Sequence, residues 1–318
     1  MYIKQLTSIL VSLSFLFVAC EKPVDLDVGY EEKLVVISHF RKDLPFYVTV
    51  SKSLDPLSTE RDFPEYLENA TVSIYNGEVL LCELPYSESI GDVFPFDGYG
   101  QEDCVPEEGV EYTLRVSAPS LKGVFASGII PSETEITAFH LSNLVKTFLS
   151  DTTAKFEFNL QLRLAETSEE ITYYLLDFNY ERIPFQVVGN DTLKVRTGIF
   201  DPVILETFDE STPMLTHFDE KVQKVLFVKK GKGPLELDFS GRTSNSIFLT
   251  IDLFDQIYAN LRTVSEDYYK YHSQLSKQKL QKDSLFVNPV VLADNVENGF
   301  GIFAGYQLTI DSVAVMPE

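Results

Sequence analysis

The chain has 318 residues, 44% of them hydrophobic, and a mean hydropathy of −0.01, a composition typical of globular proteins that excludes wholesale disorder. Its 48 acidic residues outnumber 26 basic residues, giving a net charge of −22 with the four histidines neutral. A field of that sign repels phosphates, so it excludes nucleic acid and anionic lipid headgroups as partners of the folded part.

The first twenty residues predict an export signal that ends in a lipid anchor. The apolar run Leu6–Val18, preceded by Lys4, is roughly 13 residues long and too short for the ~30 Å hydrocarbon core of a membrane. It leads into Phe17-Val18-Ala19-Cys20, which resembles a bacterial lipobox. We therefore expect residues 1–19 to be a signal peptide and Cys20 to hold acyl chains, such as palmitate, in the outer-membrane lipid bilayer. The alternative is an ordinary signal peptide with an incidental cysteine.

Residues 20–33 are predicted to form a tether. The stretch is acidic, with Glu21, Asp25, Asp27, Glu31 and Glu32. It resembles the surface-export signal of Bacteroidota lipoproteins, which implies a position on the cell surface. A solvated tether on the periplasmic face is the alternative.

Residues 34–131 predict a first β-sandwich domain, of immunoglobulin-like or transthyretin-like type. Leu34–Ile37 and Tyr47–Val50 are strand-length runs rich in β-branched residues. Asn76-Gly77 sits between two further strand patterns and predicts a hairpin with a type I′ turn. Short strands at this spacing, without a convincing helix, are typical of sandwiches.

Residues 132–318 predict a second sandwich with one helix. Apolar residues alternate with polar ones from Phe156 to Leu164, the period of a half-buried strand. A helix is expected near residues 265–281, with Ser265 as N-cap, acidic Glu266 and Asp267 at its positive end, and Lys279 at its negative end. The predicted fold class is therefore mainly β, with two consecutive β-sandwich domains and one helix in the C-terminal half.

The charge is concentrated in the first of these domains. From Asp55 to Glu111 there are fifteen acidic residues and one basic residue, whereas Lys221–Lys232 holds five lysines and no acid. The acidic stretch is interpreted either as a face for a basic partner or a divalent cation, or as a set of solvated loops. Because its spacing matches no EF-hand, we expect no metal site.

Cys82 and Cys104 are predicted to form a disulfide, since exported proteins meet an oxidising environment. Two buried free thiols are the alternative.

Motifs for the common catalytic chemistries are missing from the sequence. There is no Gly-x-Ser-x-Gly, no His-x-x-x-His, no Gly-x-x-x-x-Gly-Lys and no dinucleotide fingerprint. We therefore expect no catalytic residues, no cofactor and no enzyme activity. A hydrolase that uses two carboxylates stays open as an alternative, because 48 acidic residues offer many pairs.

The C-terminal sequence resembles a specific family. Phe286–Val290 and Asp294–Tyr306, together with Gly109-x-x-Tyr112-x-Leu114, are similar to segments of a Bacteroidota outer-membrane lipoprotein family of unknown function, often encoded next to TonB-dependent receptors. The resemblance implies an accessory lipoprotein of a TonB-dependent uptake receptor, which captures ligand or covers the receptor. A surface adhesin or structural β-sandwich module is the alternative.

Within this signature, candidate binding or interaction residues are Asn295, Gly299, Phe300, Gly301 and Phe303. The glycines would let a strand bend or let another backbone approach closely, so a tight corner between sheets is the alternative interpretation.

Asp followed by Ser or Thr and a small or aliphatic residue resembles the O-glycosylation site of Bacteroidota. It occurs at Thr152, Thr192, Ser284 and Ser312.

Overall fold

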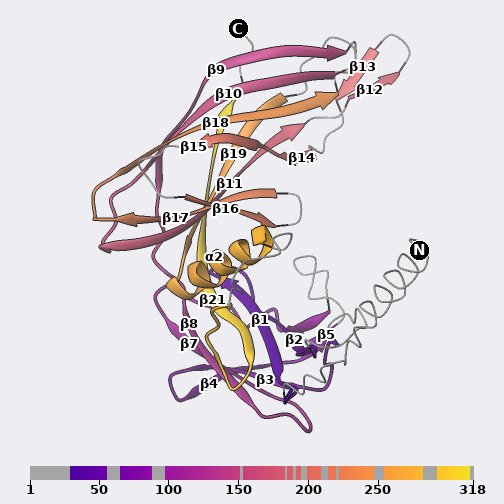
Figure 1. Ribbon diagram of the computed structural model, residues 1–318, viewed down its shortest axis with the longest axis vertical. Helices are drawn as coiled ribbons and strands as arrows, with labels where there is room; N and C mark the ends of the chain where they lie inside the picture. The colour runs from indigo at the N-terminus through magenta and orange to yellow at the C-terminus, as the bar shows by residue number, and fades with distance from the viewer. Residues whose placement is uncertain are drawn as a thin grey trace, which may run out of the picture. The chain divides into compact units, whose positions relative to one another are not determined.

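The computed structural model describes residues 29–55, 65–87, 97–150, 153–182, 185–188, 191–194, 199–208, 214–219, 222–246, 254–281 and 292–315 (Figure 1). Over these residues the chain is mainly β, with one α-helix, as the sequence predicts. The chain divides into residues 1–32 and a compact unit, residues 33–318, which contains every element described below.

The largest sheet takes strands from both ends of the chain. Within the described residues it has ten strands. Nine follow one another in the order β16 (Met214–Asp219), β17 (Val222–Lys230), β11 (Ile171–Arg182), β19 (Phe254–Val264), β21 (Phe300–Ala314), β1 (Leu34–Arg41), β2 (Tyr47–Lys52), β6 (Gly98–Gly100) and β5 (Tyr86–Ser87), and β14 (Ile199–Pro202) pairs with β11.

The described residues also form three smaller sheets. A five-stranded sheet has the order β20 (Val296–Glu297), β8 (Val124–Ile129), β7 (Glu111–Ser117), β3 (Thr71–Asn76) and β4 (Val79–Leu84). A four-stranded sheet has the order β15 (Ile204–Phe208), β18 (Leu235–Ser246), β10 (Thr153–Leu164) and β9 (Ile136–Ser150), and β12 (Phe185–Val188) pairs with β13 (Asp191–Lys194).

The hairpin predicted around Asn76-Gly77 is confirmed, but its turn is not of type I′. Asn76 pairs with Val79, so the central residues of the turn are Gly77 and Glu78. Only Gly77 has a positive φ, of +58°, whereas a type I′ turn needs two. The glycine therefore supplies the left-handed residue at the first central position, and the predicted turn was one residue too early.

Two hydrophobic cores lie between the sheets. The first is built mainly from residues 34–130, and the alternation predicted for β7 buries Tyr112, Leu114 and Val116 in it. The second is built from residues 136–315, and every apolar residue of the alternating run in β10, from Phe156 to Leu164, is buried in it. The period-2 patterns therefore identify the core-facing sides of these strands.

Strand β21 connects the two cores. Its first half pairs in parallel with β1, from Val35 opposite Phe300 to Arg41 opposite Tyr306. Its second half pairs antiparallel with β19, as Figure 1 shows for the yellow strand. The C-terminal strand thus completes the sheet that begins with residue 34. The residue ranges predicted for two domains stay predictions.

The helix predicted near residues 265–281 is confirmed as α2 (Glu266–Gln281). The Ser265 side-chain Oγ accepts the Tyr268 N–H at 3.4 Å, the N-cap bond expected of a serine at this position. The helix packs against β21, β16 and β11, where Tyr268 joins Ile302 and Ala304 in a small apolar cluster. No helix among the described residues has the length and apolar character needed to cross a membrane.

Candidate ligand-binding site

The segment singled out by the sequence, Asn295–Phe303, ties three elements together. The Asn295 Nδ2 donates to the carbonyl oxygens of Ser127 in β8, at 2.9 Å, and Phe303 in β21, at 2.8 Å. Its Oδ1 accepts the Phe303 N–H at 3.0 Å, and its Nδ2 also lies 3.4 Å from the Asp267 carboxylate of α2. One amide side chain therefore joins β8, β21 and α2.

The glycines of this segment allow β21 to approach β1 closely. Gly301 has a φ of +116°, and a Cβ there would collide with the backbone oxygen of Val36. A Cβ on Gly299 would lie 2.6 Å from the backbone oxygen of Leu34. Only glycine fits such contacts without moving the neighbouring strand.

The two phenylalanines face in different directions. Phe303 is completely buried, with its ring centroid 4.5 Å from that of Phe40. Phe300 is 44% exposed and lies beneath the Lys33 ammonium, 5.3 Å from the ring centroid. The five candidate residues thus lie together, mostly packed into the fold, and they line neither of the two pockets described below. Their binding role stays a prediction.

The other predicted sites lie apart from this segment. The structure joins Cys82 and Cys104 by a disulfide, with Cα atoms 6.3 Å apart. Thr192 lies in β13 and Ser312 is exposed on β21. Cys20, Thr152 and Ser284 fall outside the described residues.

A pocket opens where segments from the two cores meet. Its volume is about 250 Å³, and it lies between the connection that follows β8, the loop joining β10 to β11, and the junction of β19 with α2. Its lining consists of Ile129, Pro131, Ser132, Glu133, Thr134, Glu166, Thr167, Ser168, Glu169, Ile171, Thr172, Tyr173, Thr263, Val264, Ser265 and Glu266. The lining residues thus come from three segments that are far apart in the sequence.

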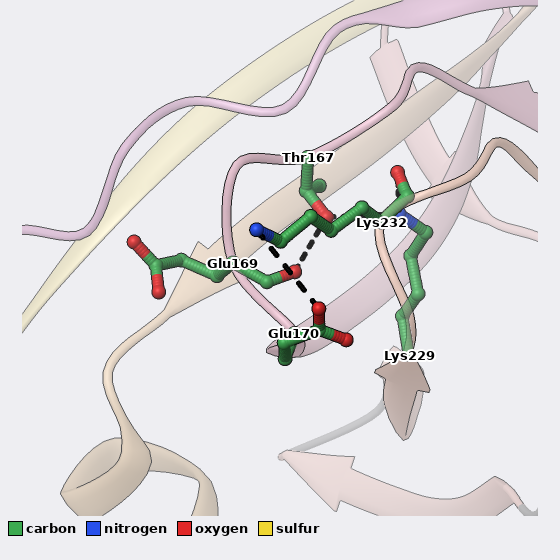
Figure 2. A network of polar contacts seen from close by, with 5 residues as sticks. All are labelled: Thr167, Glu169, Glu170, Lys229 and Lys232. Atoms are coloured by element: carbon green, nitrogen blue, oxygen red, sulfur yellow. Dashed lines mark hydrogen bonds and ion pairs between the residues drawn. The ribbon is translucent and has the colours of Figure 1, made fainter.

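A buried lysine fixes one wall of this pocket. The Lys229 Nζ donates to the Thr167 Oγ1 at 2.9 Å and to the Lys232 carbonyl oxygen at 3.2 Å. The Thr167 Oγ1 donates in turn to the Glu169 carbonyl at 3.1 Å, and Lys232 lies 3.9 Å from the Glu170 carboxylate (Figure 2). Burial lowers the pKa of Lys229, because removing an ammonium from water disfavours its charged form. This network sets the conformation of the loop between β10 and β11.

The pocket is lined by acidic, hydroxyl-bearing and apolar residues. Glu133, Glu166, Glu169 and Glu266 are part of its wall, and no lysine, arginine or histidine is. In Figure 2 the Glu169 carboxylate points away from the lysines of the network. The Lys270 ammonium lies 2.8 Å from the Glu266 carboxylate and, through that hydrogen bond, lowers the pKa of Glu266.

Two hydroxyls in the wall, those of Thr172 and Thr263, have no partner within the described part of the chain. Thr263 is only 1% exposed, and its Oγ1 is buried without a hydrogen bond. The hydroxyl of neighbouring Thr134, in contrast, lies 3.1 Å from the Tyr174 hydroxyl. A buried hydroxyl without a partner costs free energy, so the Thr263 Oγ1 is a ready site for a donor or acceptor that enters the pocket.

A second, wider groove of about 750 Å³ lies on the five-stranded sheet. The Arg115 guanidinium stacks over the Tyr75 ring, 4.3 Å from its centroid, and Phe125 is 40% exposed beside them. Hydroxyls surround this platform, including those of Thr113 and Ser127, which lie 3.3 Å apart.

Two histidines that are 233 residues apart in sequence, His39 of β1 and His272 of α2, meet where the helix packs on the large sheet. The His39 Nε2 and the His272 Nε2 lie 3.0 Å apart, and the Tyr268 ring stacks on His272 with a centroid distance of 4.4 Å. Only the β1–β21 pairing together with the docking of α2 brings them side by side.

The fold and its pockets define a mainly β protein with two concave surfaces among its described residues. The chain belongs to the family described as "Domain of unknown function (DUF4249)", whose match covers residues 21–310. No curated protein matches it.

Proposed function

We propose that this protein is a non-enzymatic, lipid-anchored accessory of a TonB-dependent outer-membrane receptor in Bacteroidota, capturing ligand at the cell surface or covering the receptor. One observation carries the proposal. The family match begins at residue 21, directly after the cysteine of the lipobox-like Phe17-Val18-Ala19-Cys20. A family match that begins one residue after the lipobox-like cysteine supports an anchored lipoprotein, since acylation would leave Cys20 as the mature N-terminus.

The finer architecture that we propose is a pair of sandwiches of immunoglobulin-like or transthyretin-like type that share β21. Support comes from the two separate cores, each enclosed between strands of different sheets. Such sandwiches commonly present binding residues on loops and open sheet faces.

Capture fits the acidic pocket better than hydrolysis by two carboxylates does. Glycoside hydrolysis needs one carboxyl group that keeps its proton near neutral pH. Lys270 acts in the opposite direction on Glu266, because it favours the ionised carboxylate. Glu266 therefore suits a binding role better than that of a proton donor.

The test is co-purification of the native lipoprotein after crosslinking and mild solubilisation of membranes. We expect a TonB-dependent receptor in the crosslinked complex, and we expect metabolic labelling with a palmitate analogue to mark the protein. A Cys20→Ser variant is the matched control, since it should lose both the label and the receptor. Recovery of the labelled protein without any receptor would contradict the proposal.

A surface adhesin is the second candidate, favoured by the groove around Tyr75 and Arg115. An aromatic–guanidinium platform surrounded by hydroxyls suits a polar, extended surface polymer. Normal uptake together with lost attachment in a deletion strain would favour this function over the first.

A further inference from the structure

We infer that the pocket between the β10–β11 loop and the start of α2 binds a small organic cation, an ammonium or guanidinium group on an apolar body. The inference deepens the capture role and rests on it for its biological meaning. Binding itself is a property of the isolated protein and is measured without any receptor.

The charge of the ligand follows from the wall of the pocket. Four glutamates line it and no basic side chain does; Glu266 is paired with Lys270, so the excess negative charge comes from Glu133, Glu166 and Glu169. The buried cation Lys229 interacts electrostatically with Glu166, but its ammonium is bound to Thr167 and Lys232 and it is not part of the lining. A ligand with positive charge gains from this field, whereas an anion is repelled.

The place of the cationic head follows from Thr263, which with Thr172 provides the two unpartnered buried hydroxyls of the wall. Its Oγ1 is buried, lacks a hydrogen-bond partner in the described part of the chain, and belongs to a residue of the pocket wall. An ammonium or guanidinium N–H donated to this oxygen would satisfy it. Hydrogen bonds to a charged donor are stronger than those between neutral groups, so this contact favours a cation over a neutral alcohol.

The body of the ligand follows from the apolar part of the wall. Ile171, Val264 and Pro131 contribute hydrocarbon surface, and Tyr173 adds an aromatic ring. A volume of about 250 Å³ accepts a single ring or a short alkyl chain and excludes a folded partner. The expected ligand is therefore a small monoamine or guanidine compound, or one lysine or arginine side chain presented by a peptide.

The experiment measures binding of three ring compounds of similar size to the full lipoprotein in detergent, by calorimetry and ligand-observed NMR. We expect benzylammonium to bind, and benzyl alcohol and benzoate to bind at least tenfold more weakly. The benzylammonium affinity should fall as salt is raised, because the glutamates of the rim are exposed. Equal binding of all three probes would overturn the inference. So would the lack of any benzylammonium binding at a ligand concentration of about 10 mM, which is high enough to detect a weak site.

Two sets of variants locate the binding. Glu166→Gln with Glu169→Gln removes two rim charges from the loop and should weaken benzylammonium at least tenfold. The matched control is Glu78→Gln with Glu83→Gln, an equal charge change on the exposed β3–β4 hairpin, which should leave affinity unchanged. Equal losses in both pairs would show that only net charge matters, and would overturn the assignment to this pocket.

Thr263→Val provides the second test, because valine has nearly the same shape and lacks the hydroxyl. We expect affinity for benzylammonium to fall roughly tenfold, as for the loss of a hydrogen bond to a charged group. The ligand-free variant should unfold at the same temperature or higher, since the substitution removes an unpaired buried oxygen. Unchanged affinity in this stable variant would overturn the position given to the cationic head. A receptor complex found in cells without amine binding would leave the proposed function standing and refute this inference alone.

Discussion

Gly301 is the residue at which the path of the backbone depends most on the lack of a side chain. Its φ is +116°, and a Cβ would occupy the place of the Val36 backbone oxygen. We expect Gly301→Ala to lower the free energy of unfolding by about 3 kcal/mol or more, because both the dihedral angle and the contact are unfavourable.

Gly77→Ala separates these two causes. Gly77 also has a positive φ, of +58°, but no atom lies within 4 Å of the position its Cβ would take. This control should cost only about 1 kcal/mol, the price of a left-handed conformation in an L-residue. Urea denaturation gives the free energy of unfolding of both variants. Equal losses of stability would contradict the prediction that close contact between β21 and β1 adds to the cost at Gly301.

Cys82 and Cys104 give a second prediction for single residues. The structure joins them across a sequence separation of 22. Alkylation before reduction should therefore leave the mass of both cysteines unchanged in the exported protein. In the loop-entropy account the Cys82→Ser, Cys104→Ser double variant loses about 3 kcal/mol of stability. Complete alkylation without a reductant would contradict the bridge.

Among the elements, β8, β21 and α2 depend on one side chain, that of Asn295. Replacing Asn295 by alanine leaves the buried Phe303 N–H without its acceptor and removes two donated bonds. We expect a loss of about 2–3 kcal/mol in the free energy of unfolding, since unpaired backbone groups pay their desolvation cost.

Asn159→Ala is the control for this substitution. Asn159 is an exposed asparagine on β10 whose side chain accepts one bond from the Ser240 hydroxyl at 3.2 Å. Its loss should stay within about 0.5 kcal/mol. Equal unfolding temperatures for Asn295→Ala and Asn159→Ala would contradict the prediction, because Asn295→Ala would then act as an ordinary surface substitution.

How far the sequence predicts this fold depends on the range of the interaction. The alternation through β10, the turn at Gly77 and the N-cap at Ser265 are local, so their residues show in a single window of sequence. The parallel pairing of β1 with β21 is not local, because it joins residues more than 250 positions apart, and neither segment by itself identifies its partner.

The candidate site shares this limit. Thr263 is unremarkable in sequence, and the four glutamates of the pocket are spread over three separate segments among many other acids. The glycines from Gly299 to Gly305 are visible as a cluster in the sequence, and in the structure they lie where neighbouring backbones are in close contact. The pocket lies elsewhere, where the connection after β8 meets the β10–β11 loop.

For the whole molecule, β21 decides how the two cores unfold. Its residue Phe303 is part of the first core and its Val313 packs against the second, so neither core keeps its full set of strands when β21 leaves the sheet. We therefore expect residues 33–318 to unfold in one cooperative transition, although two cores are present.

The chain lacks tryptophan, so a single introduced tryptophan reports on its own core alone. Tyr86→Trp places the reporter beside Tyr99 in the first core, at a ring-centroid distance of 5.5 Å in the parent chain, and Tyr180→Trp places it in the second. Because β21 couples the cores, the urea midpoint from tryptophan fluorescence should equal the midpoint from circular dichroism in each variant. Comparison within one variant removes the effect of the substitution on stability. The contrary outcome is two transitions by circular dichroism in each variant, with different fluorescence midpoints for the two reporters. It would show that the cores unfold independently and that β21 can leave one core while it stays in the other.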